Sequence, residues 1–116
     1  MSVISLHGME FFSYHGCFDE EQVLGNNFII DLSIETDTSQ AEETDDVNQT
    51  INYQVVYNLV KMEMAINSKL LENVGSRIID TIYEAFPNIT NINLTISKLN
   101  PPLDGKVDRI SVTLSR

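Results

Sequence analysis

The sequence predicts an α+β fold in which a four-stranded antiparallel sheet carries two helices on one face. Four segments alternate apolar and polar residues, as half-buried strands do, and two segments repeat apolar residues at three- and four-residue spacing, as amphipathic helices do. The order along the chain is strand, strand, helix, helix, strand, strand. Because strands and helices do not alternate, a parallel sheet is not expected. We expect one domain covering residues 1–116, a length sufficient for one hydrophobic core.

The first two strands are predicted at residues 2–14 and 28–37. Gly8 interrupts the first strand and favours a bulge or a close backbone contact there. The second strand alternates regularly, and four apolar residues share one of its faces: Phe28, Ile30, Leu32 and Ile34. Residues 15–27, between the two strands, are polar and rich in turn formers, which predicts an irregular connection.

Two helices are predicted at about residues 53–66 and 69–86. Asn52 is a suitable N-cap for the first helix, and Ser68 is a suitable N-cap for the second. Pro87 ends the second helix. The stretch before the first helix, residues 38–46, is acidic and polar and predicts at most a short turn of helix.

The last two strands are predicted at residues 90–98 and 107–115, joined by a turn that contains Pro101 and Pro102. Asn100 precedes a proline, which predicts an extended backbone at this residue. A four-stranded sheet has two open edges, which native proteins cover or pair. Pairing the sheets of several subunits into a closed barrel would remove both edges, so the sequence favours an oligomer.

The composition limits the classes of partner. The net charge is −10 and the pI is about 4.3, so the surface repels nucleic acids and anionic membranes, and we expect neither as a partner. The single cysteine, Cys17, excludes an intramolecular disulfide and favours a reducing compartment. The N-terminus lacks the basic and apolar stretches of a signal peptide, and no stretch approaches the roughly 20 apolar residues that span a bilayer. We therefore expect a cytoplasmic protein.

Three residues could carry chemistry, and two of them, Lys98 and Glu72, have two readings each when taken singly. Lys98, at the end of the third strand, is either a precisely placed amine or a solubilising surface lysine. Glu72, near the start of the second helix, is either a carboxylate close to the buried stripe or an exposed acid favoured by the helix dipole. Tyr53, at the start of the first helix, is typical of a half-buried packing residue with its hydroxyl at the rim.

The order of several short motifs resembles that of the dihydroneopterin aldolase family. The most diagnostic are Asn52-Tyr53 before the first helix, Leu70-Leu71-Glu72 at the start of the second, and Lys98 ahead of Pro101-Pro102. Further motifs are Gly8-Met9-Glu10-Phe11-Phe12 and Tyr14-His15-Gly16 with Glu21 downstream, and the likeness extends from Ile4 to Arg116. The chain departs from the family in one respect, because Leu99-Asn100 separates the lysine from the prolines, whereas many relatives have a proline directly after the lysine.

The resemblance implies a reaction and an assembly. Members of this family split 7,8-dihydroneopterin into 6-hydroxymethyl-7,8-dihydropterin and glycolaldehyde in folate biosynthesis. They have the tunnelling fold, in which subunits join their sheets into a barrel. The expected partners are therefore a pterin substrate and further copies of the chain, as a tetrameric ring and a stacked homo-octamer.

The resemblance also implies which residues bind the substrate. Glu72 is expected to anchor the pterin, since a carboxylate can accept hydrogen bonds from the adjacent 2-amino group and ring N–H. Backbone groups around Leu71 and Asn52 are expected to complete the recognition of the ring.

Three residues are expected to act in the chemical step. Lys98 resembles the lysine that serves as the base, acting through an ordered water on the hydroxyl next to the bond being broken. Tyr53 resembles the tyrosine that manages protons at the reacting carbon, and Glu21 resembles a glutamate near the substrate side chain. No metal, cofactor or Schiff base is implied, because a carbon–nitrogen double bond of the substrate can accept the electrons.

Three alternatives stay open at this point. A dihydroneopterin or dihydroneopterin phosphate epimerase would break the same bond, and a non-catalytic pterin-binding module would keep the same fold. A metal site at His7, His15 and Cys17 is disfavoured because these residues match no common zinc spacing. We assign no function to Cys17.

Overall fold

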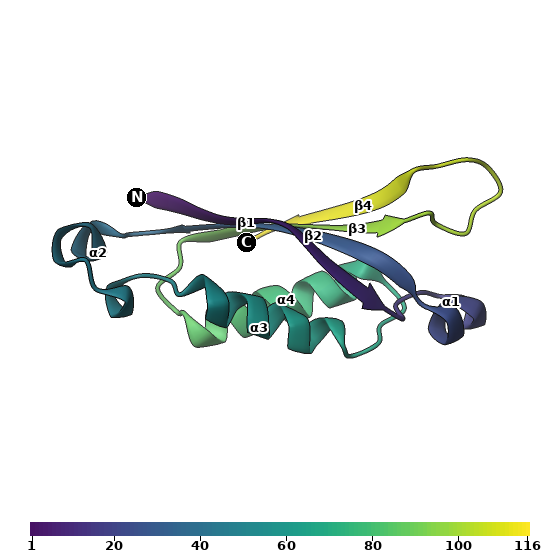
Figure 1. Ribbon diagram of the computed structural model, residues 1–116, viewed down its shortest axis with the longest axis horizontal. Coiled ribbons are helices and arrows are strands. Elements are labelled where there is room, and N and C mark those ends of the chain that lie inside the picture. Colours follow the sequence, from purple (N-terminus) through teal and green to yellow (C-terminus); the bar gives the residue numbers. More distant parts are fainter.

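The computed structural model describes residues 1–116 and contains one antiparallel sheet with the strand order β1-β2-β3-β4. The strands are β1 (Ser2–Ser13), β2 (Asn26–Thr36), β3 (Asn91–Leu99) and β4 (Arg109–Ser115). The two long helices, α3 (Tyr53–Met64) and α4 (Leu71–Ala85), both lie on one face of this sheet (Figure 1). The predicted fold class and element order are therefore confirmed.

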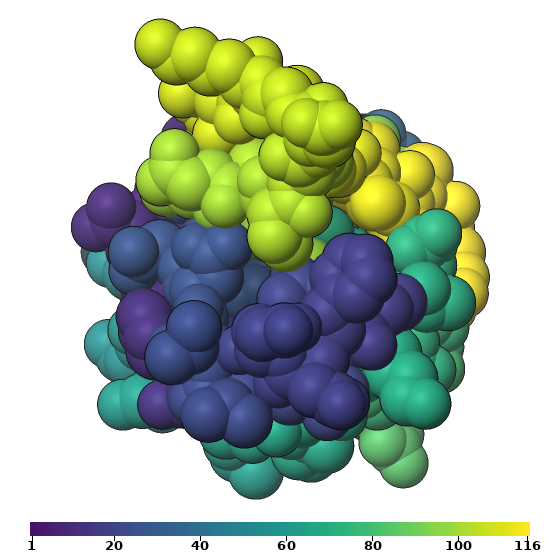
Figure 2. Space-filling model, turned by 90° about the vertical axis from the view of Figure 1, so that its right-hand side faces the viewer, coloured from purple at the N-terminus to yellow at the C-terminus, as the bar shows by residue number.

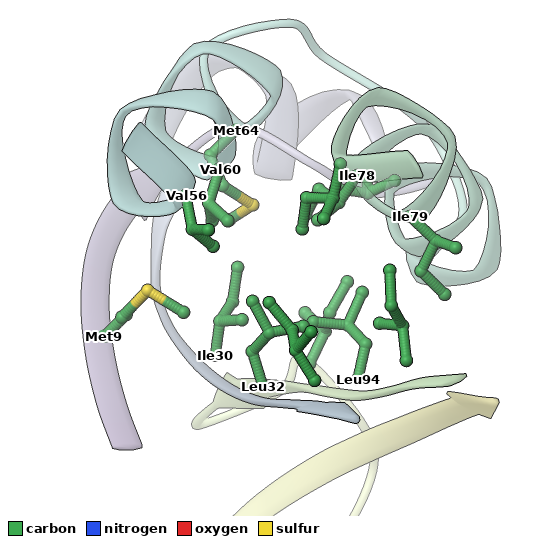
Figure 3. Close-up of a cluster of buried hydrophobic side chains, with 14 of the residues drawn as sticks. Met9, Ile30, Leu32, Val56, Val60, Met64, Ile78, Ile79 and Leu94 are labelled. Carbon is green, nitrogen blue, oxygen red and sulfur yellow. The ribbon is translucent and has the colours of Figure 1, made fainter. Parts of the chain in front are cut away.

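The hydrophobic core fills the space between the sheet and the two helices. The alternation in β2 and β3 turns one set of side chains toward the helices, and all of these are buried: Phe28, Ile30, Leu32, Ile34, Ile92, Leu94 and Ile96. Helix side chains such as Val60 and Ile78 meet them from the other side (Figure 3). Each aliphatic or aromatic side chain buried in this way stabilises the fold by roughly 1.5–3 kcal/mol.

The opposite face of the sheet is polar and no helix covers it. Hydroxyl groups pair across neighbouring strands, with Ser5 and Ser33 3.0 Å apart and Ser97 and Ser111 2.7 Å apart. β1 and β4 form the two open edges of the sheet. One face and two edges of the sheet thus stay uncovered in the single chain.

The bulge predicted at Gly8 is confirmed. The pairing of β1 with β2 shifts register between Leu6 and Met9, and Gly8 has a φ of 66°. Its N–H donates a hydrogen bond of 2.8 Å to Asp31 Oδ1 on the neighbouring strand. A glycine is required here because residues with a Cβ rarely adopt this φ.

The connection between β1 and β2 contains a short helix that the sequence analysis missed. α1 spans Asp19–Leu24, and its first turn contains Asp19, Glu20 and Glu21, which favour a helix N-terminus. None of its residues is buried, so it has no apolar stripe for a periodicity search to find. The acidic stretch that follows β2 contains two further short elements, α2 (Ser39–Thr44) and the 3₁₀-helix η1 (Val47–Gln49).

Two local predictions are wrong. α4 begins at Leu71 with Leu70 as its N-cap, rather than at residue 69 with Ser68 as the cap. The Ser68 hydroxyl instead contacts Asn73 Oδ1 at 2.6 Å and accepts a bond of 2.9 Å from Arg77 Nη2. Asn100 is left-handed, with a φ of 46°, rather than extended. Asparagine tolerates this conformation, and the Asn100 N–H donates to the Asp108 carbonyl across the β3–β4 turn.

The prediction of Asn52 as the N-cap of α3 is confirmed, because its Oδ1 accepts a 3.0 Å bond from the Gln54 N–H. None of the helices combines the length and the apolar character that crossing a bilayer requires.

Candidate functional site

A cleft of about 330 Å³ opens at the end of the sheet where β3 turns into β4. α1 and the start of α4 form further walls of the cleft (Figure 1). Figure 2 looks onto this end of the molecule, where the yellow-green β3–β4 turn projects above the blue-violet segment around α1. Four of the predicted site residues line this cleft: Glu21, Leu71, Glu72 and Lys98. The volume is in the range that holds a small heterocyclic ligand.

Lys98 reaches the cleft because it continues the inward-facing series of β3. Side chains two residues apart in a strand share a face, so Lys98 points to the same side as the fully buried Ile96. It lies at the end of the sheet, paired with Phe28 on β2 and with Ile110 on β4. Its side chain is only 13% exposed, which contradicts the interpretation as a solubilising surface lysine.

Glu21 forms an ion pair with this amine. Lys98 Nζ lies 2.6 Å from Glu21 Oε2, and the glutamate side chain is 9% exposed. The other carboxylate oxygen, Oε1, accepts a long bond of 3.4 Å from the Phe18 N–H. A charged, hydrogen-bonded pair shielded from water has a well-defined geometry, so the amine is held in one place at the cleft wall.

Glu72 lines the same cleft from the first turn of α4. In the single chain its side chain is exposed, which agrees with the second of the two readings, an exposed acid in the first turn of the helix. The buried stripe of α4 is formed by Leu71, Val74 and Ile78. The first N–H groups of a helix have no intrahelical partner. The start of α4 therefore presents backbone donors beside a free carboxylate.

Asn52 and Tyr53 lie at the start of α3, the end of that helix that is away from α1 and the cleft (Figure 1). The preceding residue, Ile51, lines a separate hollow of about 620 Å³, in which Asp37 is the only charged residue. Tyr53 is 68% exposed, so the interpretation as a half-buried packing residue is wrong for the single chain. One chain therefore brings together Glu21, Leu71, Glu72 and Lys98, but it does not bring Asn52 or Tyr53 to them.

His15, for which the sequence suggested no role beyond the motif, supports the segment that leads into α4. It is 1% exposed, and its Nδ1 accepts a 3.1 Å bond from the Ser68 N–H. The other ring nitrogen, Nε2, is buried without a hydrogen-bond partner. Burial, together with the positive charges of Arg77 and Lys98, lowers the pKa of His15 from 6.5 to about 4, against a smaller opposing effect of the Met64 backbone. The imidazole is therefore neutral at physiological pH.

Arg77 ties the same segment to α3, and sequence reasoning did not identify it. Its guanidinium donates to Glu63 Oε1 at 2.7 Å, to the Ile66 carbonyl at 2.8 Å and to Ser68 Oγ at 2.9 Å. These bonds join the end of α3 to α4 across the connection that places Glu72. No local pattern in the sequence marks Arg77, because its partners are distributed over residues 63–68.

The donors that could bind a metal do not converge. His7 is exposed on β1, whereas His15 is buried. No group of three or more His, Cys, Asp or Glu side chains is arranged to hold an ion.

Comparisons with known proteins identify similar chains. The FolB family model, described as dihydroneopterin aldolase, matches residues 4–115. The dihydroneopterin aldolase of Bacillus subtilis (strain 168) is 36% identical over 117 residues, covering 100% of this chain and 98% of the relative. The enzyme of the same name from Streptococcus pyogenes serotype M3 is 34% identical over 118 residues, with the same coverage.

A solved structure has the same fold. The E. coli dihydroneopterin aldolase, crystallised in complex with neopterin, superimposes with a TM-score of 0.91 at 19% identity. The match covers 100% of this chain and 99% of that one. At this identity the likeness supports the fold alone, including the sheet and the two helices on one face.

Proposed function

The chain belongs to the dihydroneopterin aldolase family and is an aldolase of folate biosynthesis, and we propose that the cleft between α1, α4 and the β3–β4 turn is where it splits 7,8-dihydroneopterin. One observation carries this placement: an amine and two carboxylates from distant parts of the sequence, Lys98, Glu21 and Glu72, share one small cleft. The products are 6-hydroxymethyl-7,8-dihydropterin and glycolaldehyde.

Glu72 binds the pterin ring in this proposal. Its exposed carboxylate can accept two parallel hydrogen bonds, one from the 2-amino group and one from the adjacent ring N–H. The N–H groups of Leu71 and Glu72 lie in the first turn of α4 and can donate to ring acceptors. Apolar cleft walls formed by Phe18, Leu70 and Leu103 suit the faces of a flat heterocycle.

Lys98 acts as the base. Through a water molecule it takes the proton of the side-chain hydroxyl next to the bond being broken, so that this C–O becomes the carbonyl of glycolaldehyde. The electron pair of the broken carbon–carbon bond moves into the ring C=N, and the resulting enamine is then protonated at carbon. Glu21, 2.6 Å from the amine, holds Lys98 in place and is an adjacent acceptor for the proton that Lys98 must lose before it can act. Because the ring accepts the electrons, the reaction needs neither a metal nor a Schiff base.

Asn52 and Tyr53 act from a neighbouring subunit. In the single chain neither residue lines the cleft, and Tyr53 is exposed. Asn52 caps α3 with its side chain and its carbonyl, which leaves its backbone N–H for the substrate. Joining the open edges β1 and β4 of adjacent chains would form a ring. We propose a tetrameric ring and a stacked homo-octamer in the cytoplasm, with each site completed by Tyr53 of an adjacent copy.

The test is incubation with 7,8-dihydroneopterin, followed by chromatography of the pterin products. We expect Lys98→Ala to lower kcat by at least about 100-fold while pterin binding is retained, since general base catalysis contributes this much. Glu72→Ala should instead mainly abolish binding. Lys61→Ala and Glu84→Ala remove exposed residues of the same types from α3 and α4 and should behave as the unmodified chain does. Normal turnover by both site variants would refute the site.

An epimerase that prefers a phosphorylated substrate is the second candidate. The charges in the cleft disfavour it, because Lys69 and Lys98 are balanced by Glu21 and Glu72, which leaves no excess positive charge for a phosphate. The same chromatography separates the two reactions: an isomeric pterin in place of hydroxymethyldihydropterin would establish the epimerase.

A further inference from the structure

Gly16 lies against the side chain of Glu21 with no space between them. A Cβ at position 16 would lie 2.5 Å from Glu21 Oε1 and 2.6 Å from Glu21 Cβ, which is closer than real Cβ contacts allow. The φ of Gly16 is not positive, so any residue could adopt its backbone conformation. Glycine is therefore required at position 16 because there is no room for a side chain, and not because of its backbone conformation.

The clash cannot be relieved by rotating the glutamate side chain alone. The carboxylate could swing away, but the position of Glu21 Cβ is set by the backbone of α1. Gly16 cannot retreat easily either, because its N–H donates to the Ser68 carbonyl at 3.0 Å and its own carbonyl accepts from Gln22 Nε2 at 3.0 Å. A methyl group at position 16 must displace α1, and Glu21 moves with it.

We propose that Gly16 is a positioning residue for the reaction: its missing side chain lets Glu21 lie across the backbone and present its carboxylate to Lys98. The distance of 2.6 Å between Lys98 Nζ and Glu21 Oε2 depends on this close approach. The inference rests on the proposed function, in which Lys98 is the base and Glu21 holds it. A displacement of about 1 Å in such a group can lower a rate about 100-fold.

The central experiment is a double-mutant cycle on the intact oligomer with 7,8-dihydroneopterin as substrate. We expect Gly16→Ala to lower kcat by about 100-fold, with a change of less than about threefold in KM, because Glu72 binds the ring. Glu21→Gln should lower kcat similarly and give the same pH–rate profile. Adding Gly16→Ala to Glu21→Gln should lower kcat by less than about twofold more, since both changes act through one carboxylate.

Gly75→Ala is the matched control for crowding. A Cβ at Gly75 would press on Leu114 Cδ1, where α4 packs on β4, and neither residue lines the cleft. This variant should lower Tm but leave kcat and the pH–rate profile unchanged. A merely structural role of Gly16 would give the same result as this control.

A stability cycle covers the case in which Gly16→Ala folds poorly. Glu21→Gly removes the Cβ that a methyl group at position 16 would meet. Gly16→Ala should therefore lower Tm far less in the Glu21→Gly variant than in the unmodified chain. An equal loss of Tm in both backgrounds would overturn the inference. So would full kcat in Gly16→Ala, or independent, multiplicative losses of kcat in the cycle with Glu21→Gln. Full turnover in Glu21→Gln would instead refute the role of Glu21 in the proposed function, on which the inference depends.

Discussion

At the scale of single residues, Lys98 and Glu21 illustrate how the cleft is made. Lys98 occupies an inward-facing position at the end of β3, where the core residues Ile96 and Leu94 would otherwise be continued by another apolar side chain. A lysine in such a position needs an acceptor, and Glu21, 77 residues away in the sequence, supplies it. The ion pair therefore forms because the alternation of β3 turns Lys98 inward and because α1 places Glu21 beside it.

His15 makes stability depend on pH. Its pKa is about 4 in the folded chain and 6.5 when unperturbed, so between these values the unfolded chain binds the proton and the folded chain does not. The resulting stabilisation is fully present above pH 6.5 and is lost as the pH falls toward 4. We expect a loss of roughly 2–3 kcal/mol over this range.

Urea unfolding of the chain and of His15→Gln between pH 4 and 7 measures this loss. Glutamine keeps an acceptor for the Ser68 N–H but does not titrate, so the variant should lack the part of the pH dependence that is due to His15. The carboxylates titrate in both proteins and cancel in the comparison. The same slope in both proteins would contradict the prediction.

At the scale of the elements, the start of α4 is held by its surroundings rather than by a side-chain cap. Leu70 is the N-cap and makes no side-chain cap bond. The connection before it is bonded to Gly16 through the Ser68 carbonyl, to His15 through the Ser68 N–H, and to Arg77. Glu72 is thus placed by contacts from β1's end, α3 and α4 itself.

Arg77→Gln should weaken this attachment. We expect it to lower the free energy of unfolding by about 2 kcal/mol, because the partly buried Glu63 carboxylate and the Ile66 carbonyl lose their donor. KM for 7,8-dihydroneopterin should rise more than kcat falls, since Glu72 is the proposed anchor of the ring. Urea unfolding and steady-state kinetics measure the two effects.

Arg116→Gln is the control for this prediction. Arg116 forms an ion pair with Asp80, which lies on α4 as Arg77 does, but the side chains of Arg116 and Asp80 are both largely exposed. An exposed pair contributes at most about 1 kcal/mol, so this variant should be close to the unmodified chain in both measurements. Equal effects of the two substitutions would show that Arg77 has no special role.

At the scale of the whole molecule, one chain is an incomplete catalyst in our proposal. The cleft contains the proposed base and the proposed ring anchor, whereas Tyr53, at the start of α3, does not line it. The uncovered edges β1 and β4 and the helix-free face of the sheet are surfaces that a barrel of several subunits would cover.

Mixing of inactive variants tests whether the site is shared. Lys98→Ala and Tyr53→Phe should each have little activity alone. Mixed oligomers formed by refolding the two variants together contain interfaces with both native residues, so activity should return to about one quarter of the original, as random mixing predicts. No recovery in oligomers proven to be mixed would contradict a shared site.

The four strands, the two long helices and their order could all be predicted from the residues of each segment. In each of these elements the buried residues share one face, so apolar residues recur every 2 residues in the strands and about every 3.6 residues in the helices. Such a repeat can be recognised within one short segment of sequence. The cap at Asn52 and the bulge at Gly8 were predictable from residue type, because asparagine is a suitable N-cap and glycine tolerates a positive φ. The motifs that resemble the aldolase family could also be found along the chain.

Which of these residues come into contact could be learned only from the folded chain. α1 has no buried residue and left no periodic signal, yet it supplies Glu21. The N-cap of α4 is Leu70 rather than Ser68, because the Ser68 hydroxyl is hydrogen-bonded to Asn73 and Arg77. Asn100 is left-handed, and its N–H is hydrogen-bonded across the β3–β4 turn. These outcomes depend on contacts between residues far apart in the sequence, and a local pattern contains no information about such contacts.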